Sequence, residues 1–413
     1  MQQPTVTFHP VKTALASGQD QTLDVLVRVT PPAWAHTPTR LPVNVALVID
    51  RSGSMGGEKI ETAKRVALAA LDRLAPHDRF SVVAFDSEVQ VVLPSVTGSQ
   101  TAHARELISS VRASGGTALH EGWLQGALQV AEHLRPGQLS RVLLLSDGEA
   151  NVGLTDRHEI AEQVRGLAAR GVSTSTFGIG NDYDETLMEG LANAGDGNAS
   201  YVRHAHQLEQ LFDREFQGLA SLFGRGVSLG VEPNETDGVR LVEVLNDLEL
   251  NRTGRYRLPN LQPGQPLEVV LRLRVPAGTA GEVQGVTRVR LAWDDPKTGK
   301  RYKTRVQLNL PVLTPAAVES LPSDTDVQAK VASLEIARRK VEAAEALRSG
   351  NHERAAAALL DAGSFAASAP AVPSMAREHA ELDELQRAMQ NRDDALARKL
   401  ASSQAYNRRR NRE

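Results

Sequence analysis

The sequence predicts an α/β fold: a doubly wound, mostly parallel sheet inserted in a β-sandwich and followed by a C-terminal helical region. Three observations support this prediction. Strands and helices alternate between residues 43 and 223, which is typical of a parallel sheet covered by helices on both faces. Short strands with alternating polarity lie on both sides of that stretch. Residues 323–405 have the apolar periodicity of helices.

Length and composition agree with several domains built around aliphatic cores. The chain has 413 residues, which suggests two or three domains. Hydrophobic residues make up 41% and aromatic residues only 4%, so the cores must consist mainly of Val, Leu, Ile and Ala. The formal net charge of -3 argues against a general nucleic-acid or membrane surface.

The absence of cysteine excludes disulfides, thiolate metal sites and thiol nucleophiles. No run of about 18 apolar residues occurs, so no membrane span is expected. Residues 1–16 lack a continuous apolar segment, because His9, Pro10 and Lys12 interrupt it. We therefore expect a cytoplasmic protein, although a leader removed before Met1 stays open.

The N-terminal strands are too few to form a sheet of their own. Residues 5–8 and 23–29 alternate in polarity, with a turn at residues 17–20 between them. The pattern returns in residues 226–312, where Pro, Gly and Asn separate short strands. We predict that the two parts pair into one sandwich; two independent β-modules are the alternative.

The central α/β stretch begins with a strand at residues 43–49, whose nearly unbroken apolar run indicates burial on both faces. An amphipathic helix at residues 58–74 follows. The remaining predicted strands are 80–85, 89–93, 141–145, 172–179 and 199–203, and the remaining helices are 102–112, 119–134, 156–169, 184–193 and 206–223.

The C-terminal region is predicted to hold helices at residues 327–347, 352–361 and 375–403. Ser349, Gly350 and Asn351 separate the first two, which together resemble one helical-hairpin repeat with no second copy at a fixed period. Arginines 408–410 and 412 suggest a disordered, solubilising tail. The predicted domains are 1–42 (N-terminal sandwich strands), 43–225 (α/β domain), 226–314 (rest of the sandwich), 323–405 (helical region) and 406–413 (basic tail).

A cluster of oxygen ligands is expected where the first buried strand ends. The strand runs directly into Asp50-x-Ser52-x-Ser54, and a helix follows. Ligands of open α/β sheets bind at the carboxyl ends of strands. One carboxylate and two hydroxyls at such a turn suit Mg²⁺, Mn²⁺ or Ca²⁺ and disfavour Zn²⁺ or copper.

Two further loops fall at similar places. Thr117 ends a Ser-Gly-Gly-Thr loop just before a helix. Asp147 follows the buried strand 141–145 and precedes Gly148. Each residue also has a plain structural explanation: Asp50 and Thr117 as helix N-caps, Asp147 as a turn residue, and Glu149 and His120 as surface residues.

The three motifs, in this order, resemble the metal-ion-dependent adhesion site of the von Willebrand factor A family. The resemblance implies that Ser52 and Ser54 bind the metal directly, Thr117 binds it in the liganded state, and Asp50 and Asp147 act directly or through water. It implies Mg²⁺ first, with Ca²⁺ or Mn²⁺ as alternatives, and an open position for an Asp or Glu of a protein partner. The flanking sandwich is similar to that of inter-alpha-trypsin-inhibitor heavy-chain-like and chloride-channel-regulator-like proteins.

The resemblance therefore favours a metal-dependent scaffold or adaptor that is not an enzyme. Family members suggest an ATPase or a kinase-phosphatase system as the partner; a membrane or nucleic-acid partner is not expected. One alternative is a Mg²⁺-dependent phosphoryl hydrolase with Asp50 as the nucleophile, but Ser52 stands where a second carboxylate is needed and no Lys follows on a matching loop. The other is a nucleic-acid-associated factor that binds through the basic tail.

Overall fold

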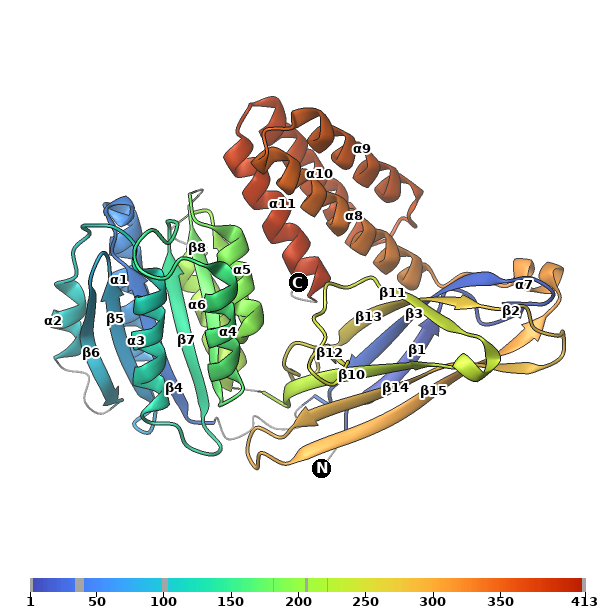
Figure 1. The fold of residues 1–413 in the computed structure, drawn as a ribbon, viewed down its shortest axis with the longest axis horizontal. Helices are drawn as coiled ribbons and strands as arrows, with labels where there is room; N and C mark the ends of the chain where they lie inside the picture. Colours follow the sequence, from blue (N-terminus) through green and yellow to red (C-terminus); the bar gives the residue numbers. More distant parts are fainter. Residues whose placement is uncertain are drawn as a thin grey trace. The chain divides into compact units, whose positions relative to one another are not determined.

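The computed structural model describes residues 3–33, 41–98, 103–180, 182–204, 207–220 and 222–410. The chain divides into two compact units. One contains Met1–Ala35, Phe223–Asp295 and Arg301–Glu413; the other contains His36–Leu222 and Pro296–Lys300. The first is the sandwich with its helical region, and the second is the α/β unit (Figure 1).

The α/β unit is built on a six-stranded sheet with the order β6-β5-β4-β7-β8-β9. All neighbouring strands are parallel except β5 and β6. The strands are β4 (Val43–Asp50), β5 (Arg79–Phe85), β6 (Val89–Thr97), β7 (Leu139–Ser146), β8 (Val172–Ile179) and β9 (Asp196–Val202). The helices are η1 (Gly53–Met55), α1 (Glu58–Asp72), α2 (Ala104–Ser109), α3 (Leu119–Ala131), α4 (Arg157–Ala168), α5 (Glu185–Ala194) and α6 (Gln207–Ala220).

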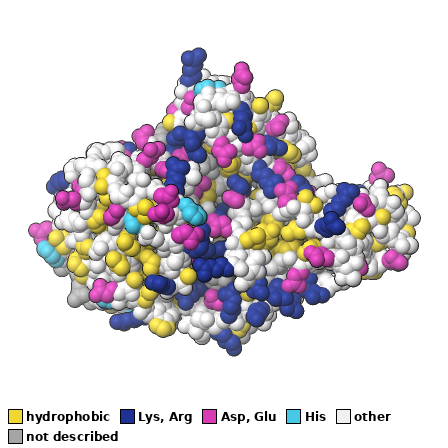
Figure 2. All heavy atoms as spheres, in the orientation of Figure 1, with side chains coloured by type: hydrophobic (Ala, Val, Ile, Leu, Met, Phe, Trp, Pro, Cys, Tyr) yellow, Lys and Arg dark blue, Asp and Glu magenta, His cyan; other side chains and the backbone are white. Residues whose placement is uncertain are grey.

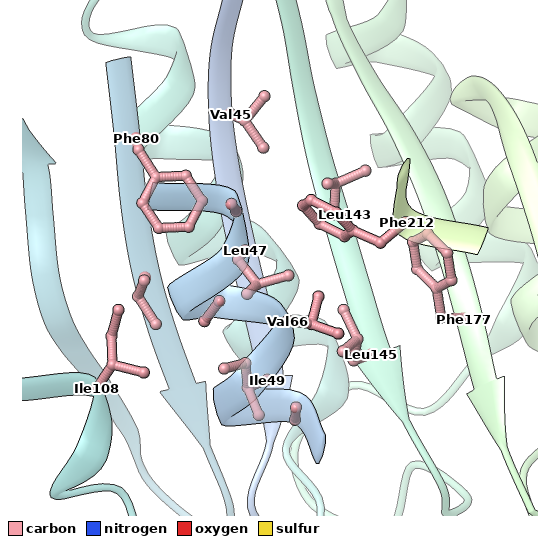
Figure 3. Close-up of a cluster of buried hydrophobic side chains, with 14 of the residues drawn as sticks. Val45, Leu47, Ile49, Val66, Phe80, Ile108, Leu143, Leu145, Phe177 and Phe212 are labelled. Carbon is pink, nitrogen blue, oxygen red and sulfur yellow. The ribbon is translucent and has the colours of Figure 1, made fainter. Parts of the chain in front are cut away.

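Strand β4 is apolar from Val45 to Ile49 because both of its faces are covered. Val45, Leu47 and Ile49 belong to a core that includes residues of α1, α2 and α6, as Figure 3 shows. Ala46 and Val48 belong to a second core with α3, α4 and α5. Helix α3 packs closely on the sheet at Gly126, where an added Cβ would lie 2.2 Å from Val48 Cγ2. The strand that ends at Asp50 is therefore fixed from both sides.

The other unit contains two packed sheets, with the orders β1-β3-β13-β11 and β12-β10-β14-β15-β2. The strands are β1 (Thr5–Pro10), β2 (Leu15–Ala16), β3 (Gln21–Thr30), β10 (Arg225–Pro233), β11 (Arg240–Val244), β12 (Tyr256–Arg257), β13 (Leu267–Val275), β14 (Val283–Asp294) and β15 (Arg301–Leu313). Helix η2 (Glu235–Asp237) lies in a connection. N-terminal β3 pairs with β13 from Gln21 to Val29, so the predicted sandwich with an inserted α/β unit is confirmed, and two independent β-modules are excluded.

The helical region differs from its prediction in its helix boundaries, in a second hairpin and in its last residues. It consists of α7 (Pro315–Ser320), α8 (Thr325–Arg348), α9 (His352–Ser368), α10 (Pro373–Gln390) and α11 (Asp394–Arg409). The single helix expected at 375–403 is broken, because Arg392 adopts a left-handed conformation with φ 56°.

A second helical hairpin does exist, contrary to the prediction. Asn351 N donates to Ala346 O at 2.8 Å in the α8–α9 turn, and Asp393 N donates to Ala388 O at 3.0 Å in the α10–α11 turn. The side chains of Asn351 and Asp393 then cap the following helices. The left-handed position is Gly350 in the first turn and Arg392 in the second, so the second turn lacked the usual glycine signal.

The predicted basic tail is part of this hairpin. Helix α11 runs to Arg409, and the side chain of Arg408 is buried against Glu378, with Arg408 Nε donating to Glu378 Oε1 at 2.6 Å. The pairing of Arg408 with an interior carboxylate is the physical reason why the chain stays ordered here. Residues 411–413 lie outside the described residues.

The helical region packs on the sheet β1-β3-β13-β11 of its own unit. Val327 and Leu334 of α8 share a small apolar core with Leu26 and Val270. Arg272 of β13 donates to Glu335 of α8 at 2.9 Å. Within the described stretches, no helix is long and apolar enough to cross a membrane.

A buried charge network gives the helical region a pH dependence. Glu378 is 1% exposed and accepts hydrogen bonds from Lys340 at 3.0 Å, Arg408 at 2.6 Å and Ser333 at 2.6 Å. Burial raises the pKa of Glu378, but the charges of Lys340 and Arg408 with these hydrogen bonds outweigh it, so the net pKa is below its ordinary value. A lowered pKa in the folded state means that stability is lost as the pH falls through that pKa.

We predict that Glu378→Gln lowers the free energy of unfolding by about 3 kcal/mol at pH 7, because Lys340 and Arg408 lose the more deeply buried of the two carboxylates, Glu378 and Glu381, with which they pair. The difference in unfolding free energy between the variant and the unaltered protein should shrink as the pH falls below the ordinary pKa of glutamate. Protonation of Glu378 then breaks the same ion pairs in the unaltered protein. Urea denaturation at pH 7 and at a pH below the ordinary pKa of glutamate measures this difference. Asp383→Asn, at an exposed position of α10, is the control. A deficit that stays constant with pH would contradict the assignment.

Candidate metal centre

The central strands of the α/β sheet bring two carboxylates to one edge. Strands β4 and β7 are parallel neighbours in register from Val43–Leu139 to Ile49–Leu145. Strand β4 ends at Asp50 and β7 ends at Ser146, directly before Asp147. Both carboxylates are fully buried. Two buried negative charges side by side need compensation from a cation or from hydrogen-bond donors.

Hydrogen bonds hold the Asp50 carboxylate in one orientation. Oδ1 accepts from Ser52 N at 2.8 Å, and Oδ2 accepts from Ser146 Oγ at 2.5 Å. Burial raises the pKa of Asp50, the Ser146 and Ser52 hydrogen bonds lower it, and the neighbouring Asp147 raises it, so that the net pKa lies above its ordinary value. The centre thus has an excess of negative charge that a bound cation would relieve.

The two serine hydroxyls lie between the carboxylates. Ser52 Oγ and Ser54 Oγ are 3.1 Å apart, and Ser54 Oγ donates to Asp147 Oδ1 at 2.7 Å. This proton is directed to Asp147, so the lone pairs of Ser54 Oγ remain available to a metal. Met55 is fully buried in the core and anchors the short helix η1 that presents both serines.

Thr117 joins this group from the third loop. Its side chain is buried, and its backbone N–H donates to Asn151 Oδ1 at 2.9 Å. A Cβ added to Gly148 would lie 3.6 Å from Thr117 Oγ1 and 3.7 Å from Ser54 Oγ. The structure therefore places Asp50, Ser52, Ser54, Asp147 and Thr117 around one point, with the bare backbone of Gly148 leaving space among the hydroxyls.

The alternative structural explanations fit these residues less well. Helix α1 begins after Gly57, and helix α3 begins after Ala118, so neither Asp50 nor Thr117 occupies the N-cap position. Glu149 is exposed, as predicted. His120 was expected at the surface, but it is 8% exposed and bonds to Gln163 at 3.0 Å, because α3 packs this face against α4.

Asp86 organises the loops, and the sequence interpretation missed it. It follows β5, and its Oδ2 contacts Arg51 Nε at 3.1 Å and Ser114 Oγ at 3.0 Å. Burial raises the pKa of Asp86, but hydrogen bonds from Glu88 N and Ser114 and the charge of Arg51 outweigh it, so the net pKa is lowered. The same signal that revealed Asp50, a carboxylate at the end of a buried strand, could have revealed it.

Lys59 was also missed. The sequence offered no lysine on a matching loop, yet Lys59, in the first turn of α1, donates to Asp147 Oδ2. The Lys59 side chain passes Gly180, where an added Cβ would lie 3.4 Å from Lys59 Cε. One positive charge thus already sits beside one of the two carboxylates.

The candidate oxygen set relies on hydroxyls as well as carboxylates. Among the described residues, no group of three His, Cys, Asp or Glu side chains could hold a metal ion. Any cation at this edge must therefore take neutral oxygens from Ser52, Ser54 or Thr117 in addition to the two carboxylates. Such a donor set suits a hard cation.

Comparison with known proteins agrees with this geometry. The family description "von Willebrand factor type A domain" matches residues 44–214, the stretch that carries all three loops. The chain carries a von Willebrand factor type A domain. A solved structure described as von Willebrand factor type A from Catenulispora acidiphila has a TM-score of 0.68 at 20% identity and covers 89% of this chain and 87% of that one. The ArnB paralog VWA2 from Sulfolobus acidocaldarius has a TM-score of 0.61 at 19% identity, with 99% of each chain covered. Both confirm the predicted fold class.

The match to one sequence relative extends well beyond this domain. An uncharacterized protein of Synechocystis sp. is 29% identical over 79% of this chain and 79% of its own length. Human inter-alpha-trypsin inhibitor heavy chain H4 is 33% identical over 39% of this chain, but the match spans only 18% of that protein. The Escherichia coli protein YfbK is 30% identical, with 46% of this chain and 34% of that protein matched. The predicted resemblance to von Willebrand factor A proteins is confirmed.

We predict that Lys59→Met lowers the stability of the metal-free α/β unit by about 1–2 kcal/mol, because a fully buried Asp147 loses its cationic partner. Thermal unfolding in a chelator measures this, and Mg²⁺ should restore more stability to the variant than to the unaltered protein. Lys59→Arg is the matched control and should behave as the unaltered protein does. An unchanged melting temperature for Lys59→Met would show that the ion pair between Lys59 and Asp147 does not stabilise the folded unit.

Proposed function

We propose that the von Willebrand factor type A domain holds one divalent cation through Asp50, Ser52, Ser54, Thr117 and Asp147, and binds an acidic side chain of a protein partner there. The observation that carries the proposal is the convergence of three hydroxyls and two buried carboxylates beside Gly148. Mg²⁺ is the first candidate, and Ca²⁺ and Mn²⁺ are alternatives, because all three favour oxygen ligands.

The charge balance explains the preference for an acidic partner. The two carboxylates would offset the two charges of the cation, and Lys59 adds one further positive charge beside Asp147. The loaded centre would therefore carry net positive charge in a partly buried place, where an incoming Asp or Glu is favoured over a neutral group. The ion would act as a Lewis acid that receives the partner's oxygen.

The residues of this centre are placed to bind a ligand and not to catalyse a reaction. Both oxygens of Asp50 are engaged, by Ser52 N and Ser146 Oγ, which leaves that carboxylate poorly placed as a nucleophile. Lys59 is engaged by Asp147. We therefore favour a scaffold or adaptor over a phosphoryl hydrolase. Arg408 of the supposed basic tail is directed inward to Glu378, which weakens the nucleic-acid alternative.

Several details of the prediction rest on family resemblance alone. Von Willebrand factor type A domains commonly act as metal-dependent protein-interaction modules, and the matched relatives include heavy chains of inter-alpha-trypsin inhibitor. An ATPase or kinase-phosphatase system as the partner stays a prediction, as does a cytoplasmic location.

Metal titration by calorimetry tests the proposal. We expect the metal-stripped chain to bind one Mg²⁺ or Mn²⁺ per molecule, and Asp50→Ala/Ser52→Ala to lose at least 100-fold in affinity, because a charged ligand and a direct hydroxyl ligand both disappear. Glu106→Ala/Ser109→Ala, on the exposed side of α2, removes the same kinds of groups elsewhere and should bind normally. Equal binding by the first pair and by the unaltered chain would place the metal elsewhere.

A single substitution in the same centre separates binding from catalysis. Release of phosphate from a simple aryl phosphate in the presence of Mg²⁺, abolished by Asp50→Ala, would favour the hydrolase over the scaffold. Under the proposal, any trace of turnover should be unaffected by Asp50→Ala.

A further inference from the structure

The outer face of the sheet β12-β10-β14-β15 collects positive charge. The register places Arg290 opposite both Gly230 and Arg305, and Asp294 opposite Arg301. The residues between them, such as Leu291 and Trp293, belong to the sandwich core, so this set faces outward. Figure 2 shows Lys and Arg side chains gathered over this part of the sandwich unit. The cations of this face are Arg255, Arg257, Arg288, Arg290, Arg301, Lys303 and Arg305.

The acids of this face are already occupied. Glu232 contacts Arg290 at 2.9 Å and Arg288 at 3.9 Å, and Asp294 contacts Arg301 at 2.8 Å. Lys303 and Arg305 are exposed, and no acid in the described part of the chain forms an ion pair with them.

Opposed like charges cost stability on this face. Arg290 and Arg305 stand directly opposite each other on β14 and β15, an arrangement that destabilises a strand pair. The chain as a whole has a net charge of -3, whereas this face carries mainly positive side chains. A charge concentration kept at such a cost points to an anionic partner.

Strand β15 also has an open edge. It pairs with β14 along one side from Arg301 to Pro311, but on its other side it pairs with β2 only at Val312 and Leu313. From 301 to 311, no described strand pairs with β15 on that second side. Backbone donors and acceptors of an open edge are a template for a further strand. Figure 1 shows β15 beside β14.

The open edge and the charges coincide on one strand. Arg301, Lys303 and Arg305 alternate along β15 on the same outward face. An added strand has the same repeat, about 6.6–6.8 Å for every two residues. We propose that β15 accepts an extended acidic segment of a partner protein as an additional strand, with an acid at every second position facing Arg301, Lys303 and Arg305.

Other occupants fit this edge less well. A second copy of the same edge would bring Arg301, Lys303 and Arg305 against identical cations. A single-stranded nucleic acid would find no aromatic platform, because Tyr256 and Tyr302 pack against the sandwich core. Lysines and arginines on an edge strand can also serve only to repel other strands, and the experiment below separates that role from binding.

The test uses the full chain and a fluorescent nine-residue peptide of alternating Glu and Thr, followed by anisotropy at physiological salt. We expect saturable binding that falls at least tenfold in Arg301→Glu/Lys303→Glu/Arg305→Glu. The matched control, Arg354→Glu/Arg377→Glu/Arg387→Glu, changes the same charge at exposed positions of α9 and α10 and should bind normally. Absence of peptide binding by the unaltered chain would overturn the proposal and leave the cations as strand-repelling groups.

Backbone methylation of the peptide keeps its charge and tests strand addition directly. Methylating alternate amides on one edge of the peptide should weaken binding at least tenfold, while methylating the other set should not, because only one edge of an added strand pairs with β15. Equal binding by both methylated peptides would overturn the proposal. So would an oligonucleotide that binds more tightly than the peptide and depends on the same three cations, since that result would indicate a general polyanion surface.

Discussion

The parallel pairing of β4 with β7 is the constraint on which the rest of the candidate centre depends. It brings the ends of two fully buried strands together, so that Asp50 and Asp147 share one edge of the sheet without solvent around either carboxylate. Such a pair is stable only if other groups compensate its charge. In this chain the compensation comes from Ser52 N, Ser54, Ser146 and Lys59.

The surrounding fold makes that arrangement rigid. Alternate residues of β4 pack into two cores on opposite faces, which fixes the strand before it reaches Asp50. Asp86 ties the first loop to the Thr117 loop through Arg51 and Ser114. The side chains that carry the ligand oxygens are already held by hydrogen bonds and packing. They therefore lose little conformational entropy when a cation binds.

Much of this could be read from the sequence. The nearly unbroken apolar runs predicted the buried strands, and the polar residues that follow residues 43–49 and 141–145 predicted where the loops meet. Pairing of the N-terminal strands across the inserted unit followed from their being too few to stand alone. What the sequence hid were long-range partners: Lys59 reaches Asp147 from a helix, and Arg408 reaches Glu378 from the last helix. Spacing along the chain carries no information about such contacts. The helix break at Arg392 was missed because the residue in the left-handed conformation is an arginine, whereas a glycine at that position would have indicated a turn.

We propose that hydroxyls and carboxylates from three loops hold one cation. Anomalous diffraction from crystals soaked in Mn²⁺ tests it most directly, because the ion can be located without reference to any partner. We expect one peak beside Gly148, within about 2.0–2.3 Å of the hydroxyl oxygens of Ser52 and Ser54. A peak at another place, or none at saturating Mn²⁺, would contradict it, and the shared edge of β4 and β7 would then be a hydrogen-bonded structural feature only.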